Sequence, residues 1–131
     1  MKELIEIQSK LNAPKNQRNN FGKYNYRSCE DILEALKPLL KEQGCLLRIE
    51  DTITMVGDRH YIKATATVSK EDQSVTVSAF AREPLNKKGM DESQITGATS
   101  SYARKYALNG LFLIDDNKDS DVEGSKKDRD A

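Results

Sequence analysis

The spacing of hydrophobic residues along the chain divides it into helical and extended segments. Near the start, Leu4, Ile7 and Leu11 recur at spacings of three and four. This spacing predicts a short amphipathic helix that ends before Asn12 and Pro14.

A second helix is predicted over residues 29–43. Ser28 is followed three residues later by Asp31, which resembles a capping box at a helix start. The apolar positions that follow form one face suited to burial: Ile32, Leu33, Ala35, Leu36, Leu39 and Leu40. Gly44 is expected to end the helix. Pro38 is expected to kink or break it, because its ring removes a backbone donor.

Between residues 46 and 82 the hydrophobic spacing changes to two, which is typical of half-buried strands. The apolar positions are Leu47, Ile49, Ile53, Met55, Tyr61, Ala64, Ala66, Val68, Val75, Val77 and Ala79. Turn residues at Gly57-Asp58 and at 71–73 divide this stretch into three strands. The pattern therefore predicts a three-stranded antiparallel β-meander.

A last helix is predicted from Glu92 or Ser93 to Leu108, with Asn109-Gly110 as its C-terminal stop. Its apolar stripe is expected to be Ile95, Ala98, Tyr102 and Tyr106. The elements together predict an α+β fold in which the helices at 29–43 and 93–108 pack on one face of the meander. Unpaired strands at the edges of the sheet would favour a homo-oligomer.

Charge is distributed unevenly along the 131 residues, although Lys+Arg and Asp+Glu are both 21. The last 17 residues hold seven acids and four bases, so the rest of the chain carries about +3. Low apolar content accompanies the acidic stretch, which is typical of disorder. We expect one folded domain over residues 1–114 and an acidic disordered tail over 115–131.

Several kinds of chemistry lack their sequence signatures. The two cysteines, Cys29 and Cys45, have no metal-ligand spacing, and His60 is the only histidine, so neither a zinc site nor a histidine base is expected. No phosphate-binding loop is present in the sequence. We expect free thiols, no metal, no cofactor, no catalytic centre and hence no enzyme. Without a signal-peptide core or a membrane-length apolar run, we expect a cytoplasmic protein with no membrane partner.

Residues 12–27 combine basic and aromatic side chains without a single acid. The bases are Lys15, Arg18, Lys23 and Arg27, and the aromatic residues are Phe21, Tyr24 and Tyr26. A mobile loop of this composition suits phosphate contact combined with base stacking. The alternative is that the rings only fasten the loop to the core. A third basic element, Lys87 and Lys88 in the loop at 84–92, could equally be a solvated tip.

The last helix offers a slim polar face. Gly97, Ser101, Arg104 and Lys105 follow at i, i+4, i+7 and i+8, on the side predicted to lie away from the apolar stripe. Small residues permit close approach of another backbone, and hydroxyls beside bases can hold phosphate oxygens. The alternative is a solvated face whose bases complement the helix dipole.

Two long blocks resemble the ERF (essential recombination function) family of bacteriophage single-strand annealing proteins. They are FGKYNYRSCEDILEALKPLL at 21–40 and GMDESQITGATSSYARKYALNGLFLIDDNKDSD at 89–121, and the resemblance extends from about Leu4 to Asp121. It implies ATP-independent binding of single-stranded DNA, annealing of complementary strands in phage homologous recombination, and ring or helical homo-oligomers. It also implies a β-β-β-α core similar to that of the eukaryotic strand-annealing mediators, and it allows a host or phage single-strand binding protein as partner.

The resemblance carries DNA-binding candidates onto particular positions. With the basic loop included, they are Lys23, Tyr24, Tyr26, Arg27, Lys87, Lys88, Gln94, Thr96, Ser100, Ser101, Arg104 and Lys105. One departure is that family members commonly continue into a longer C-terminal region, whereas only about ten residues follow Asp121 here. The chain is therefore a short member or a truncated one, which puts the partner-binding functions of that region in doubt.

The main alternative is a non-annealing module, either an RNA-binding or a protein-scaffolding domain, in which the basic loop is structural. Comparing strands with and without a 2′-hydroxyl separates these functions, since RNA-specific proteins contact that group. A nucleic-acid-processing enzyme ranks third, because it would need clustered acids on the sheet or a phosphate loop.

Overall fold

The computed structural model describes residues 1–84 and 91–114, so Lys87, Lys88 and the tail expected at 115–131 lie outside the described residues. The elements follow in the order α1 (Lys2–Lys10), β1 (Gln17–Asn19), β2 (Tyr24–Tyr26), α2 (Cys29–Gln43), β3 (Leu46–Val56), β4 (Arg59–Lys70), β5 (Gln73–Arg82) and α3 (Glu92–Phe112). Among the described residues, none of the helices combines the length and apolar character needed to cross a bilayer.

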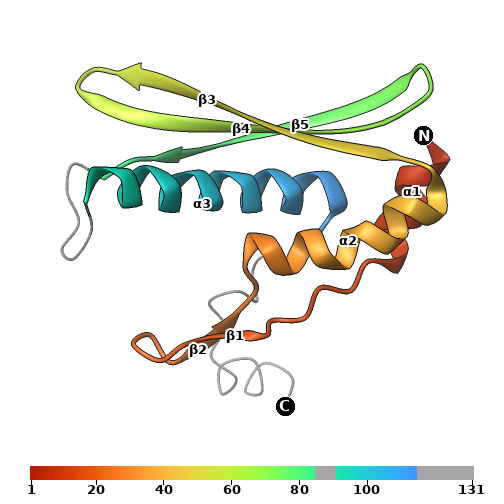
Figure 1. Cartoon of the computed structure of the whole chain (residues 1–131), viewed down its shortest axis with the longest axis horizontal. Helices are drawn as coiled ribbons and strands as arrows, with labels where there is room; N and C mark the ends of the chain where they lie inside the picture. The colour runs from red at the N-terminus through yellow and green to blue at the C-terminus, as the bar shows by residue number, and fades with distance from the viewer. Residues whose placement is uncertain (85–90, 115–131) are drawn as a thin grey trace, which may run out of the picture.

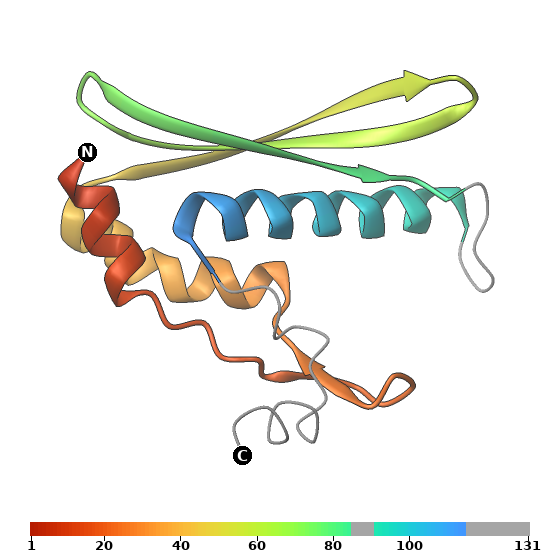
Figure 2. The same ribbon diagram turned by 180° about the vertical axis from the view of Figure 1, so that it is seen from behind.

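The expected three-stranded meander is confirmed. β3, β4 and β5 pair in sequence order and antiparallel, and α1, α2 and α3 all lie on one side of the sheet (Figures 1 and 2). α3 packs on β4 and β5 as predicted, whereas α2 packs mainly against α1 and α3. The alternating residues Ile62, Ala64, Ala66 and Val68 of the central strand are 0–2% exposed beneath the helices. The fold is α+β, as the sequence predicts.

The face of α3 that packs on the sheet differs from the predicted one. Ile95, Thr99, Ala103 and Ala107 are buried, whereas Tyr102 is exposed. Ala98 and Tyr106 are exposed as well, so three of the four residues predicted for the apolar stripe do not contribute to the core. Small side chains on the helix match alanines on the sheet, so the two can approach closely without a stripe of large residues.

The predicted C-terminal stop of α3 is also wrong. The helix continues through Asn109 and Gly110 to Phe112, and it ends at Leu113, whose φ is 57°. Leu111 and Phe112 are 2% and 1% exposed, so their burial explains why the helix extends past two residues that usually end one.

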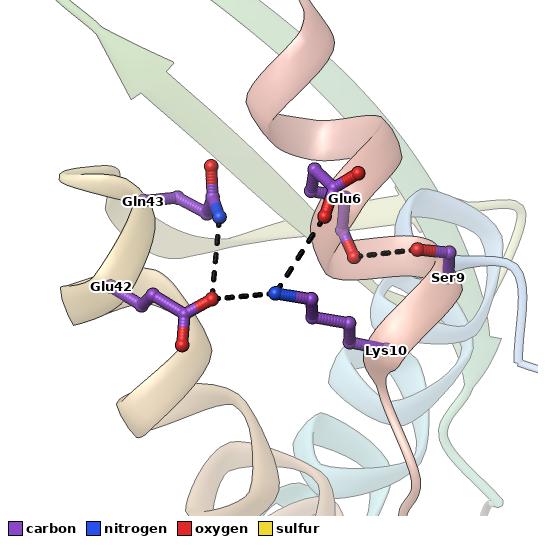
Figure 3. A network of polar contacts seen from close by, with 5 residues as sticks. All are labelled: Glu6, Ser9, Lys10, Glu42 and Gln43. Atoms are coloured by element: carbon purple, nitrogen blue, oxygen red, sulfur yellow. Dashed lines mark hydrogen bonds and ion pairs between the residues drawn. The ribbon is translucent and has the colours of Figure 1, made fainter.

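α2 begins as expected and runs through its proline. The Ser28 hydroxyl accepts from Asp31 N, the Asp31 side chain accepts from Ser28 N, and Gly44 ends the helix at φ 68°. Of the kink or break expected at Pro38, a break is absent, because Pro38 lies inside the continuous helix. Lys10 of α1 reaches across to α2, with its Nζ 2.8 Å from Glu42 Oε1 (Figure 3). Both side chains of that pair are about half exposed, so it adds little stability.

The segment predicted as a loop at 12–27 contains a short antiparallel hairpin. Gln17 pairs with Tyr26 and Asn19 with Tyr24, which makes β1 and β2 a two-stranded sheet of their own. Gln17 Nε2 also donates to the Asp31 carboxylate at 3.2 Å, which joins the hairpin to the start of α2. No alternating apolar pattern marks these strands, because both faces of the hairpin are largely polar.

Candidate nucleic-acid interface

The hairpin places an aromatic residue against the last helix. Lys105 Nζ of α3 lies 5.8 Å from the ring centroid of Tyr26 on β2, within the range of a cation–π contact. Tyr24 lies beside Tyr26, with ring centroids 6.0 Å apart and planes tilted by 58°. Two blocks nearly eighty residues apart in sequence therefore meet, and we call Tyr24, Tyr26 and Lys105 the junction.

The turn of the hairpin holds one junction ring in place. The Tyr24 hydroxyl accepts from Asn19 Nδ2 at 3.0 Å. A Cβ on Gly22 would come 2.4 Å from Tyr24 Cε1, so only glycine allows the ring to lie over the turn. At the tip, Phe21 is 100% exposed and Lys23 is exposed with a φ of 57°.

Arg27, the fourth candidate in this segment, lies differently. Its Nε donates to the backbone oxygen of Ala13 at 2.7 Å, in a partly buried position. This bond ties the end of the hairpin to the chain that leads into it. Arg27 therefore supports the position of the hairpin, whatever else its guanidinium contacts.

One row of candidates on α3 forms hydrogen bonds to acidic residues of the sheet. Ser100 Oγ donates to Asp51 Oδ2, and Arg104 Nε donates to Asp51 Oδ1 at 3.1 Å. Thr96 Oγ1 donates to Glu83 Oε2 at 3.0 Å. These contacts link α3 to β3 and to the residue that follows β5. Asp51 and Glu83 were not identified from the sequence, since partners this distant are brought together only by the fold.

The contacts of Asp51 with Ser100 and Arg104, which we call the clamp, lower the pKa of Asp51. Burial raises the pKa of Asp51, but the hydrogen bonds from Arg104 and Ser100 and the positive charge of Arg104 outweigh it, and the pKa lies below the ordinary value. The carboxylate is therefore ionised at neutral pH and remains a firm acceptor for Arg104.

Gln94 is also engaged in local structure. Its Oε1 accepts from Asp91 N at 3.0 Å, and its own backbone N donates to Asp91 Oδ1 at 2.8 Å, which completes a capping box at the start of α3. These contacts assign Gln94 a role in beginning the helix.

The remaining polar residues of α3 form a second row. Gly97 and Ser101 are exposed and Lys105 is half-buried, at intervals of four residues that put them on one side of the helix. A Cβ added to Gly97 would meet nothing within 4 Å. The predicted polar face thus divides into Ser100 and Arg104, engaged with the sheet, and Gly97, Ser101 and Lys105, directed elsewhere.

The described part of the chain holds no group of three or more histidine, cysteine or acidic side chains placed to bind a metal ion. His60 is exposed on β4. Cys29 is buried, Cys45 is partly buried, and both are free thiols. Burial raises the pKa of both thiols, so each stays protonated and a poor nucleophile at neutral pH.

Comparisons with known proteins agree along the whole chain. A family model described as the ERF superfamily matches residues 1–131. The chain is 64% identical over 128 residues to a protein of Salmonella phage P22 named Essential recombination function protein, and the alignment covers 98% of this chain. It covers 62% of the relative, so the chain spans about three fifths of that protein's length. No solved structure matches.

Proposed function

Because the chain belongs to the ERF superfamily, we propose that it binds single-stranded DNA and anneals complementary strands in phage homologous recombination, without ATP and without a catalytic centre. The name of the phage P22 relative assigns recombination to that protein. We extend this role to the present chain and propose the chemistry by which its own residues perform it.

The observation that carries the proposal is the contact between Tyr26 and Lys105. A ring supplies a stacking surface for a base, and an ammonium group beside it neutralises a phosphate. Tyr26 comes from the first sequence block of DNA-binding candidates and Lys105 from the second. The fold places Lys105 Nζ 5.8 Å from the centroid of the Tyr26 ring. Such a pairing of ring and cation suits a single strand, whose bases are free to stack.

The hairpin tip extends this surface. Phe21 is 100% exposed, so covering its ring with an apolar surface lowers the free energy. An unstacked base offers a planar apolar face that can cover it. Lys23 lies two residues after Phe21 and is exposed, so its side chain can reach the DNA backbone next to that base. In the proposed complex the strand passes from the tip, over Tyr24 and Tyr26, to Lys105.

Annealing follows from binding the backbone while leaving base edges accessible. Lysines neutralise phosphates on the bound strand, so a second strand approaches with less repulsion and tests successive registers until pairing prevails. Base pairing supplies the free energy, which is why neither ATP nor a cofactor is required.

We propose that homo-oligomers extend the binding surface from subunit to subunit as a ring or helical filament. β3 and β5 are the outer strands of the described sheet and could pair with neighbouring copies. Ile53, Met55 and Val56 at the end of β3 are each about 60% exposed, which would favour burial in such a contact. We propose a host or phage single-strand binding protein as a further partner.

The test is an annealing assay in which a fluorophore and a quencher are carried on complementary oligonucleotides. The wild type should accelerate quenching equally with ATP, without ATP and with a non-hydrolysable analogue. Tyr26→Leu combined with Lys105→Gln should slow it. Acceleration that required nucleotide, or that occurred only with RNA strands, would overturn the proposal.

A further inference from the structure

The face of the sheet opposite the helices is uncovered by any described element. α1, α2 and α3 all lie on the inner side (Figures 1 and 2). Side chains alternate between the faces of a strand, so those neighbouring the buried positions of β4 point outward. The outward set at one end of β4 and β5 is Tyr61, Lys63, Phe80 and Arg82.

These four side chains form a tight group on adjacent strands. Tyr61 pairs with Arg82 and Lys63 with Phe80 in the register of β4 and β5. Lys63 Nζ lies 5.8 Å from the Phe80 ring centroid, and Phe80 is 59% exposed. The two rings occupy diagonal positions, roughly 7–8 Å apart at their backbones. We call this group the outer patch.

The charges on this face are strongly one-sided. On the outward positions of the three described strands the bases are Arg48, Arg59, Lys63 and Arg82, and the acid is Glu50. Glu50 is engaged with Arg48, whose Nε lies 2.7 Å from Glu50 Oε1. Within the described residues Lys63 and Arg82 form no ion pair, so their charges are available to an anion.

Hydroxyl groups continue the surface along the same two strands. Thr65 and Ser78 lie 3.0 Å apart at their Oγ atoms, and so do Thr67 and Thr76. Each pair has two hydroxyl protons, and one of them forms the hydrogen bond between the two oxygens. The second proton of each pair can therefore be donated to an outside acceptor such as a phosphate oxygen.

We propose that the outer patch is a second binding site for single-stranded DNA, separate from the junction on the helical side. Bases stack on Phe80 and Tyr61, Lys63 and Arg82 contact phosphates, and the Thr/Ser pairs guide the backbone along the sheet. This inference rests on the proposed function, and it adds a second DNA track on the opposite side of the subunit. The exposed ring of Phe80 and the partly exposed ring of Tyr61, beside cations that form no ion pair among the described residues, complement a polyanion that carries aromatic bases.

The experiment is photocrosslinking of the full chain to an oligonucleotide that contains 5-iodouracil, which reacts with aromatic side chains stacked on it. Crosslinked peptides are identified by mass spectrometry. We expect crosslinks at Phe80 and Tyr61 in addition to those at Tyr24 or Tyr26. The variant that combines Lys63→Gln with Arg82→Gln keeps both rings. It should reduce the crosslinking yield at Phe80 and Tyr61 several-fold and leave the crosslinking yield at the hairpin unchanged.

A matched control removes two charges from a different surface. Lys37→Gln with Lys41→Gln, on exposed positions of α2, should leave the outer-patch yield unchanged. Crosslinks confined to the hairpin would overturn the second site and preserve the proposed function. No crosslink anywhere would overturn both. A change of oligomer mass in the Lys63/Arg82 variant, without crosslinks at Phe80, would assign the patch to contact with a second copy and overturn the inference.

Discussion

Arg104 holds Asp51 with two donors: its Nε lies 3.1 Å from Oδ1 and its Nη2 lies 3.2 Å from Oδ2. The residues are 53 positions apart, and the contact fastens α3 to the edge strand β3. The next residue, Lys105, lies instead at the hairpin beside Tyr26. Two adjacent bases that look equivalent in sequence therefore have different surroundings, and we expect them to differ in function.

We predict that Arg104→Ala lowers the free energy of unfolding by about 1 kcal/mol, because it removes a two-pronged, partly exposed ion pair. Lys105→Ala should lower it by less, about 0.5 kcal/mol, through the loss of its contact with the Tyr26 ring. Arg104→Lys should restore only part of the loss, since an ammonium group cannot form the same fork. Urea unfolding measures all three. An Arg104→Ala variant as stable as the wild type would show that the contact with Asp51 does not stabilise the fold.

The clamp should also respond to acid. Since the pKa of Asp51 is lowered from its ordinary value of 3.8, its contribution to stability is present above that value. It is lost as the pH falls through the lower pKa of the folded state. The stability difference between the wild type and Asp51→Asn should therefore be constant near neutral pH and shrink below about pH 4. A difference that grew on acidification would contradict the assignment.

Gly97 and Gly110 both lie in α3, so substitution of each by alanine compares the same change in two surroundings. Gly97→Ala should raise the free energy of unfolding by about 0.5–1 kcal/mol, because the helix gains propensity and the new Cβ meets nothing within 4 Å. Gly110→Ala should gain less, since its Cβ would lie 3.1 Å from Val77 Cγ1. Thermal unfolding of both variants checks the order. A larger gain in stability from Gly110→Ala would mean that Val77 of β5 moves away from the new Cβ more readily than the 3.1 Å distance indicates.

The sequence predicted the meander because the alternation in 46–82 is strong and its turns are marked by residues such as Gly57-Asp58. It failed on the buried face of α3, where Thr99, Ala103 and Ala107 carry little hydrophobic signal and the exposed Tyr102 carries much. Asn109 was expected to help end the helix, but burial of the following residues outweighed that local preference.

The candidate site was only partly predictable for a related reason. Composition identified the basic aromatic segment and the polar face of α3, but it could not separate Lys105 from Arg104. That distinction depends on Asp51, a strand residue that the sequence does not single out and that reaches Arg104 only through tertiary packing. Phe21 was noted as one ring among three, whereas only the fold shows that it is fully exposed.

Contact between the junction and DNA phosphates is tested by the salt dependence of affinity for a single-stranded oligonucleotide. For the wild type, log affinity should fall linearly with log salt, and Lys105→Gln should flatten the slope by about 0.7 if Lys105 contacts one phosphate. Lys41→Gln, a matched loss of charge at an exposed position of α2, should leave the slope unchanged. Equal slopes for the wild type and Lys105→Gln would contradict the account, because the junction would then contact no phosphate.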